Sequence, residues 1–175
     1  MRLFLALWPP AEAIAHAQHA VAPVRTSFPD LRWIPADRWH LTLAFYGEVT
    51  DRDAGRLEAR LGRQVARHAA MTLRFKGSGR FPKRAVWLGV SGDVRPLQAL
   101  AQRVARDDRP YRPHLTVARL RGRTDPSGAV EALAEYEGPK WEAAEVALVR
   151  SHLGPSPTYE TFATFPFATF SEPAG

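Results

Sequence analysis

The chain has 175 residues, of which 45% are hydrophobic, and this length allows one well-buried domain with two similar halves but excludes two large domains. It contains no cysteine, which excludes a disulfide framework, a thiolate metal site and a cysteine nucleophile. The formal net charge of +6 and the pI of about 10.3 favour a polyanionic partner, although the arginine-rich composition of a GC-rich genome would give the same excess.

The N-terminal half predicts alternating strands and helices. Its apolar start meets Pro9-Pro10, so it is too short to span a membrane, and it lacks the small-residue cleavage site of a leader. We therefore expect a buried first strand and a soluble, cytoplasmic protein. The expected elements are a strand over 3–7, a helix over about 11–24, an extended piece at 32–35, a strand from His40 to Tyr46, a helix capped by Asp51 that runs to about His68, and a strand over 72–75.

The C-terminal half continues the alternation. The expected elements are a Gly-rich basic connection over 76–83, a strand over 85–90, a helix over 94 to about 105, a strand from His114, a helix from Ser127 to near Tyr136, and strands over 141–150 and 158–165. A similar order of strands and helices surrounds two of the histidines, which predicts an α+β fold with internal duplication. Two sheets that face each other across a cleft, each with one histidine strand, would follow.

The most informative pattern is a histidine, a leucine, a threonine, an aliphatic residue and an alanine, which occurs at 40–44 and again at 114–118. An arginine stands two positions before each histidine, at Arg38 and Arg112. Because side chains alternate along a strand, the histidine and threonine share one face in each copy, and the aliphatic residues share the other with Phe45. The alanine leaves room for a ligand. One copy alone would be typical of solvated surface, but two matched copies indicate a functional site.

Two imidazoles without a thiol or a matched carboxylate favour acid and base chemistry at phosphorus. Histidine titrates at about pH 6.5 in model peptides, so His40 and His114 can coexist with one ring neutral and the other protonated. One ring then takes a proton from the attacking oxygen, and the other gives a proton to the leaving oxygen. We expect Thr42 and Thr116 to donate hydrogen bonds to the non-bridging oxygens of the phosphate.

The sequence also bears on which arginines bind the phosphate and on whether the site holds a metal ion. Arg119 would interrupt the apolar face of its strand, so we expect it where the strand emerges, and Arg112 is the second candidate for binding the phosphate. A metal held by two histidines and a carboxylate is the competing chemistry. Threonine stands where that carboxylate would be expected, and Glu48 and Asp37 have no counterpart in the other half. We therefore expect no metal and no other cofactor.

The paired motifs resemble those of the two-histidine (2H) phosphoesterase superfamily, specifically its RNA 2′,3′-cyclic phosphodiesterase branch, historically called 2′-5′ RNA ligases. The resemblance covers essentially the whole chain. One departure is Tyr46, where many relatives carry leucine. If Tyr46 lies at the edge of the cleft, its ring would stack on a base; the alternative is that the ring packs in the protein interior. The matching stretches are 2–7, 39–48, 81–82 with 85–90, and 111–119.

The resemblance implies a bilobal fold over a single domain, 1–175, in which two antiparallel sheets face a central cleft and helices cover the outer faces. It also implies hydrolysis of an RNA or nucleotide 2′,3′-cyclic phosphate to the 2′-phosphate, with the bond to the 3′-oxygen broken. By this analogy His40 is the proton donor to the 3′-oxygen, and His114 is the proton acceptor that activates water. The historical name adds reversible 2′-5′ RNA ligation.

Other contacts and other functions stay open at this point. The connection over 76–83 is expected either to bind RNA or to be an ordinary solvated loop. The alternatives to RNA cyclic phosphodiesterase activity are hydrolysis of a small nucleotide such as ADP-ribose cyclic phosphate, and a non-catalytic module that binds RNA ends. We expect a monomer. The candidate RNA contacts outside the motifs are Lys76, Arg80, Phe81, Lys83 and, as a residue that lines the cleft, His152.

Overall fold

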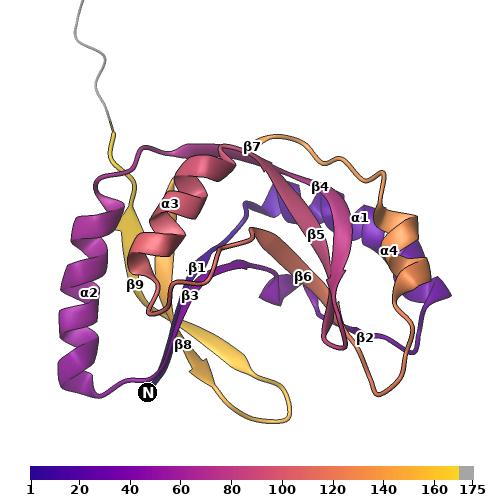
Figure 1. Cartoon of the computed structure of the whole chain (residues 1–175), viewed down its shortest axis with the longest axis horizontal. Coiled ribbons are helices and arrows are strands. Elements are labelled where there is room, and N and C mark those ends of the chain that lie inside the picture. The colour runs from indigo at the N-terminus through magenta and orange to yellow at the C-terminus, as the bar shows by residue number, and fades with distance from the viewer. Residues whose placement is uncertain (170–175) are drawn as a thin grey trace, which may run out of the picture.

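Two antiparallel sheets form the framework of the molecule (Figure 1). The structure is a computed structural model, and it describes residues 1–169. In chain order the elements are β1 (Arg2–Leu7), α1 (Ala11–Ser27), β2 (Arg32–Trp33), the short 3₁₀ helix η1 (Ala36–Arg38), β3 (Leu41–Glu48), α2 (Asp51–Val65), β4 (Met71–Phe81), β5 (Ala85–Gly92), α3 (Val94–Val104), β6 (His114–Arg119), α4 (Ser127–Leu133), β7 (Trp141–Ala143), β8 (Glu145–His152) and β9 (Thr158–Pro166). The first sheet has the order β3-β1-β8-β9 and the second β2-β6-β5-β4-β7. The predicted fold class is confirmed.

The chain passes between the two sheets several times. α1 follows β1 of the first sheet but packs against α4, which lies on the second sheet, and α3 follows β5 of the second sheet but packs against α2 and β3 (Figure 1). The single strand expected over 141–150 is two strands, because the chain changes sheet at Ala144: β7 pairs with β4, and β8 pairs with β1. Each sheet therefore contains segments from both halves of the sequence.

The apolar faces predicted for α2 and α3 are buried, as expected. Burial of one such side chain contributes about 1.5–3 kcal/mol, so these faces hold both helices against the sheets. The inward residues are Leu57, Leu61 and Val65 of α2 and Leu97, Leu100 and Val104 of α3. Within residues 1–169, none of the helices combines the length and the apolarity that crossing a bilayer requires.

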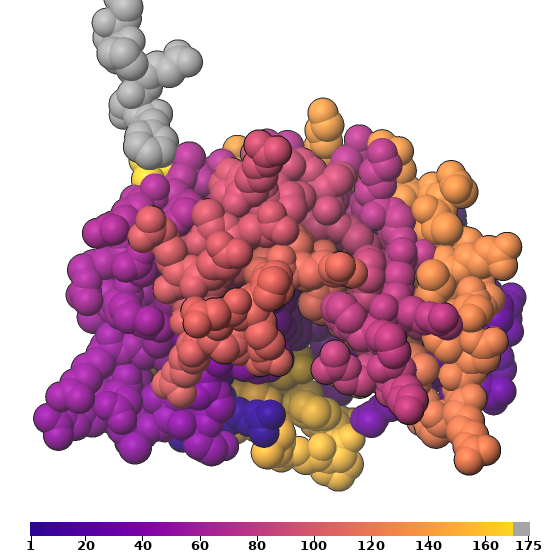
Figure 2. All heavy atoms as spheres, in the orientation of Figure 1, coloured from indigo at the N-terminus to yellow at the C-terminus, as the bar shows by residue number. Residues whose placement is uncertain are grey.

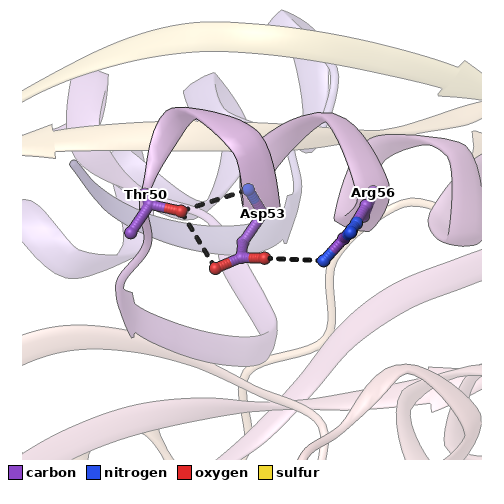
Figure 3. Close-up of polar contacts among 3 residues, drawn as sticks. All are labelled: Thr50, Asp53 and Arg56. Carbon is purple, nitrogen blue, oxygen red and sulfur yellow. Dashed lines mark hydrogen bonds and ion pairs between the residues drawn. The ribbon is translucent and has the colours of Figure 1, made fainter.

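The N-terminus of α2 is capped by Thr50 rather than by Asp51, the residue expected to do so (Figure 3). The Thr50 hydroxyl accepts a hydrogen bond from the Asp53 backbone N–H at 3.2 Å and donates one to the Asp53 carboxylate at 2.9 Å. Arg56 lies 3.5 Å from the same carboxylate, an exposed contact that contributes little. The Thr50 side chain therefore acts as an N-cap, which satisfies one of the backbone N–H groups that the first turn of a helix leaves unpaired.

β4 continues through most of the segment that was expected to be a loop. The strand runs to Phe81, so the prediction of a connection over 76–83 is wrong, and only the turn at 82–84 joins β4 to β5. Its glycines serve the strand pairing. Gly77 has a positive φ of 70° at an irregularity in the β4–β5 register, and a Cβ on Gly79 would lie 2.3 Å from the Trp87 ring. Glycine here permits a bulge and a close approach between strands.

Candidate active site

A cavity of about 340 Å³ lies between the two sheets and includes both histidine motifs. In the space-filling view the surface is hollowed between the salmon segment before β6, the magenta β4–β5 hairpin and the yellow β8–β9 hairpin (Figure 2). Among the described residues, the lining contains four arginines and no carboxylate, so the cavity suits an anion. Its principal lining residues are Arg2, Phe4, Arg32, Trp33, Arg38, His40, Thr42, Phe45, His114, Thr116, Arg119, Ser151, Leu153 and Tyr159.

The two motif strands carry the same irregularity at the same position. In β3, Thr42 pairs with Ala6 and Ala44 with Leu5, so Leu43 has no partner. In β6, Thr116 and Ala118 pair with two adjacent residues of β5. Val117, which lies between them, therefore has no partner. Such a bulge places two residues opposite one and reverses the side-chain alternation beyond it. The same device in both strands is the geometry that a duplicated unit produces.

The bulge corrects two expectations. Phe45 was expected on the buried face, but it is 67% exposed and lines the cavity, because it lies beyond the bulge. Tyr46 is turned into the core, where it is 3% exposed and its hydroxyl donates to the Val104 carbonyl at 3.1 Å. Burial raises the pKa of Tyr46 far above its usual range. The packing alternative for Tyr46 is therefore the one found, and Arg119, the residue after the second bulge, lines the cavity.

Each catalytic candidate histidine is held by a backbone carbonyl two residues earlier. His40 Nδ1 lies 2.7 Å from the Arg38 carbonyl, and His114 Nδ1 lies 2.7 Å from the Arg112 carbonyl. A carbonyl only accepts, so Nδ1 carries the hydrogen in both rings, and Nε2 is the nitrogen that exchanges protons. His40 Nε2 lies 3.1 Å from the Thr42 hydroxyl. The contact to the histidine is thus made by the backbone of each preceding arginine, not by its guanidinium.

The surroundings of the two rings differ. His40 packs against Phe4, Trp8 and Tyr159, with ring centroids 5.1, 5.0 and 5.4 Å away. His114 meets the edge of Phe81 at 4.7 Å and lies 6.3 Å from Trp87. Enclosure by aromatic rings removes water from an imidazolium ion, which favours the neutral ring.

Both histidines consequently have a lowered pKa. Burial is the main cause for His40, with the charges of Arg119 and His114 acting in the same direction, while the Arg38 carbonyl opposes them. Burial also dominates the lowered pKa of His114, with added charge from Arg112 and Arg119 and opposition from the Arg112 carbonyl. The charge of Arg119, which lines the cavity, lowers the pKa of both rings. Arg112 does not line the cavity, although its charge reaches His114.

The other candidate RNA contacts lie away from the cavity or beside it. Phe81 packs against His114 without lining the cavity. Lys76 lies 3.9 Å from Glu137 and Arg80 lies 4.0 Å from Asp125, two carboxylates in the segments that flank α4. Lys83 lies in the β4–β5 turn with a positive φ. His152 pairs with Glu160 at 2.9 Å instead of lining the cavity, whereas its neighbours on both sides line it.

Several lining residues were not found by sequence reasoning. Arg2 comes from the start of β1, Arg32 and Trp33 come from β2, and Tyr159 comes from β9. Arg32 pairs in register with Arg119, which brings a second guanidinium to the same edge of the second sheet. The only signal for β2 was the extended piece before the His40 motif. Among residues 1–169 no group of three or more histidine, aspartate or glutamate side chains is arranged to hold a metal ion.

Comparisons with known proteins agree on one family. The family model described as the 2′-5′ RNA ligase superfamily matches residues 7–155. The RNA 2′,3′-cyclic phosphodiesterase of Thermus thermophilus is 33% identical, over 94% of this chain and 89% of that protein. The RNA 2′,3′-cyclic phosphodiesterase of Escherichia coli is 35% identical, over 67% of this chain and 71% of that protein. The crystal structure of E. coli LigT with 3′-AMP superposes with a TM-score of 0.79 and 26% identity, over 96% of this chain and 98% of that one.

Proposed function

The chain belongs to the 2′-5′ RNA ligase superfamily, and from this premise we propose that it hydrolyses RNA 2′,3′-cyclic phosphate ends to 2′-phosphomonoesters without a metal ion. The observation that carries the proposal is the pair of matched His-x-Thr strands in one arginine-lined cavity, in each of which a backbone carbonyl holds histidine Nδ1 and leaves Nε2 for proton transfer. The names of the relatives support the substrate.

The proposed reaction is an in-line displacement with two proton transfers. His114 Nε2 takes a proton from water while the water oxygen attacks phosphorus. The bond from phosphorus to the 3′-oxygen breaks, and that oxygen takes the proton of His40 Nε2, which leaves a 2′-phosphate and a 3′-hydroxyl. This order of roles follows the family analogy. The two rings end with exchanged protonation states, and exchange with solvent restores them.

The phosphate itself needs donors that are in place before the reaction. We assign its non-bridging oxygens to the hydroxyls of Thr42 and Thr116, which lie two residues along each strand from the histidines, and to the guanidinium of Arg119. Charge on these oxygens must be held as the transition state forms, and fixed donors in a partly dry cavity do so without reorganisation. Phe45 replaces Tyr46 as the candidate for stacking on the terminal base, because its ring is exposed at the cavity wall.

The decisive experiment is product analysis with an oligonucleotide that ends in a 2′,3′-cyclic phosphate. We expect a 2′-phosphate product, with an unchanged rate in excess EDTA. Loss of activity in EDTA would overturn metal independence, and a 3′-phosphate product would overturn the proposed bond cleavage. Binding without turnover would support the alternative of an RNA-end-binding module, and exclusive turnover of ADP-ribose cyclic phosphate would support the small-nucleotide alternative.

Three narrower expectations belong to the same proposal. A 5′-hydroxyl that attacks phosphorus in place of water, with the same bond to the 3′-oxygen broken, would give 2′-5′ ligation, and cleavage of the 2′-5′ linkage is its reverse; a cyclic-phosphate RNA and a 5′-hydroxyl RNA test this directly. Size-exclusion chromatography with light scattering tests the proposed monomer. Cell fractionation tests the proposed cytoplasmic location, where RNA ends would be the accessible substrate.

A further inference from the structure

A second cavity, of about 310 Å³, adjoins the proposed catalytic cavity. The two share Arg38, Pro157 and Tyr159 as lining residues, so they meet at a common wall beside His40. Trp8 and Thr161 line the second cavity but not the first. The second cavity is therefore the neighbouring space for a ligand that is held at the histidines and is longer than the first cavity.

The chemistry of the ribose determines which part of an RNA chain reaches that space. In-line displacement puts the attacking water and the departing 3′-oxygen on opposite sides of phosphorus. Because His40 is assigned to the 3′-oxygen, C3′ of the terminal ribose lies on the His40 side. C4′ and C5′ continue from C3′, whereas the base is attached through C1′, beside C2′. The 5′-phosphate and the preceding nucleotide thus leave the cavity on the His40 side.

The groups at that exit suit a phosphate followed by a base. Arg38 is half-buried, and its guanidinium forms no ion pair with any carboxylate of residues 1–169. Trp8 and Tyr159 both line the second cavity, with ring centroids 6.3 Å apart, and aromatic rings stack on any base. Asp37 also lines the second cavity and would repel a phosphate, so the phosphate position is assigned to the shared wall at Arg38.

We propose that the second cavity is a subsite for the nucleotide that precedes the cyclic end, with Arg38 at the linking phosphate and Trp8 and Tyr159 at the base. This inference rests on the proposed function and narrows its substrate to an RNA chain. A cyclic mononucleotide fills the catalytic cavity alone, whereas a dinucleotide fills both.

The test compares three substrates: cytidine 2′,3′-cyclic phosphate, its 5′-phosphorylated form, and cytidylyl-cytidine 2′,3′-cyclic phosphate. We expect kcat/KM to rise in that order, with the dinucleotide about 10-fold or more above the mononucleotide, because it adds one charge-assisted contact and one stacked base. Thr161 offers a matched set of variants, since it is exposed and lines only the second cavity. Thr161→Glu should lower kcat/KM for the dinucleotide about 5-fold by charge repulsion, while Thr161→Arg holds or raises it.

Thr161→Gln controls for side-chain size, and all three variants should keep the rate for the mononucleotide. Equal kcat/KM for mononucleotide and dinucleotide in the unmodified protein would overturn the subsite. So would a Thr161→Glu variant that loses the same factor on both substrates. Failure of the proposed function looks different, because the unmodified protein would then hydrolyse none of the three substrates.

Discussion

The strands β3 and β6 share a bulge, a hydrogen bond from the histidine to the carbonyl two residues earlier, and a threonine beside the histidine. Their surroundings differ: three aromatic rings enclose His40, whereas Phe81 and Trp87 flank His114. The position after the bulge is Phe45 in one strand and Arg119 in the other. The backbone that positions the two histidines is thus alike in both strands, while the side chains around them are not. The differences place an aromatic ring at the β3 side of the cavity and a guanidinium at the β6 side.

The largest effect is expected from removal of either imidazole, which tests whether β3 and β6 both contribute to catalysis. We expect His40→Ala and His114→Ala each to lower kcat by roughly 10²–10⁴-fold, the typical contribution of one proton transfer. His19→Ala is the matched control, because His19 is exposed on α1, outside the cavity. Single-turnover rates on a cyclic-phosphate RNA measure the effect. A variant that keeps its full rate would show that only one of the two strands is catalytic.

The residues after the bulges should separate binding from chemistry. Arg119→Gln should lower kcat/KM about 100-fold, mainly through kcat, because its charge is needed most as the transition state forms. Phe45→Leu should raise KM about 10-fold at nearly constant kcat, since stacking holds substrate and transition state alike. Steady-state kinetics on cytidine 2′,3′-cyclic phosphate measures both. Equal effects on kcat in the two variants would contradict the division of roles.

Packing behind His114 gives a prediction about stability. Gly79→Ala would place a methyl group within 2.3 Å of the Trp87 ring, so we expect a loss of about 1–3 kcal/mol in the free energy of unfolding. Gly55→Ala is the control, because Gly55 lies in α2 with nothing within 4 Å and should gain about 0.5–1 kcal/mol. Urea denaturation followed by fluorescence distinguishes them. If Gly79→Ala left the free energy of unfolding unchanged, the Trp87 ring would have to move aside at no cost in stability.

The pH profile tests the enclosure of the histidines. Because the pKa of each ring lies below 6.5, the acid is already losing its proton at that pH, and the base is already neutral. We expect kcat/KM, which reports the free protein, to have its maximum on the acid side of pH 6.5. Tyr159→Ser should admit water to His40 and move the alkaline limb upward. A maximum well above pH 6.5, with no response to Tyr159→Ser, would contradict this view of the site.

The local chemistry was predictable from the sequence, but the cross-strand geometry was not. The repeated motif identified His40, Thr42, His114 and Thr116 because residue type and alternation are local properties, and all four line the cavity. The bulges depend on register with β1 and β5, so alternation alone assigned Phe45 to the wrong face and left Tyr46 open between stacking and packing.

Long-range assembly accounts for the remaining differences. Arg2, Arg32 and Tyr159 come from three segments distant in sequence, and no local pattern joins them. The glycines of β4 predicted a loop because glycine is typical of turns. Their role depends on Trp87 in the neighbouring strand, which makes small residues necessary at this pairing.

Because each sheet contains strands from both halves of the sequence, neither half can complete a sheet during synthesis on the ribosome. The first sheet joins β1 and β3, near the start of the chain, to β8 and β9, near its end. His40 is synthesised early, whereas Tyr159, whose ring packs against it, is synthesised more than a hundred residues later. A nascent chain that already carries both histidines therefore has one sheet unfinished and the edge of β1 unpaired. A chain released before β9 is made would therefore carry both His-x-Thr motifs but lack the Tyr159 ring that packs against His40.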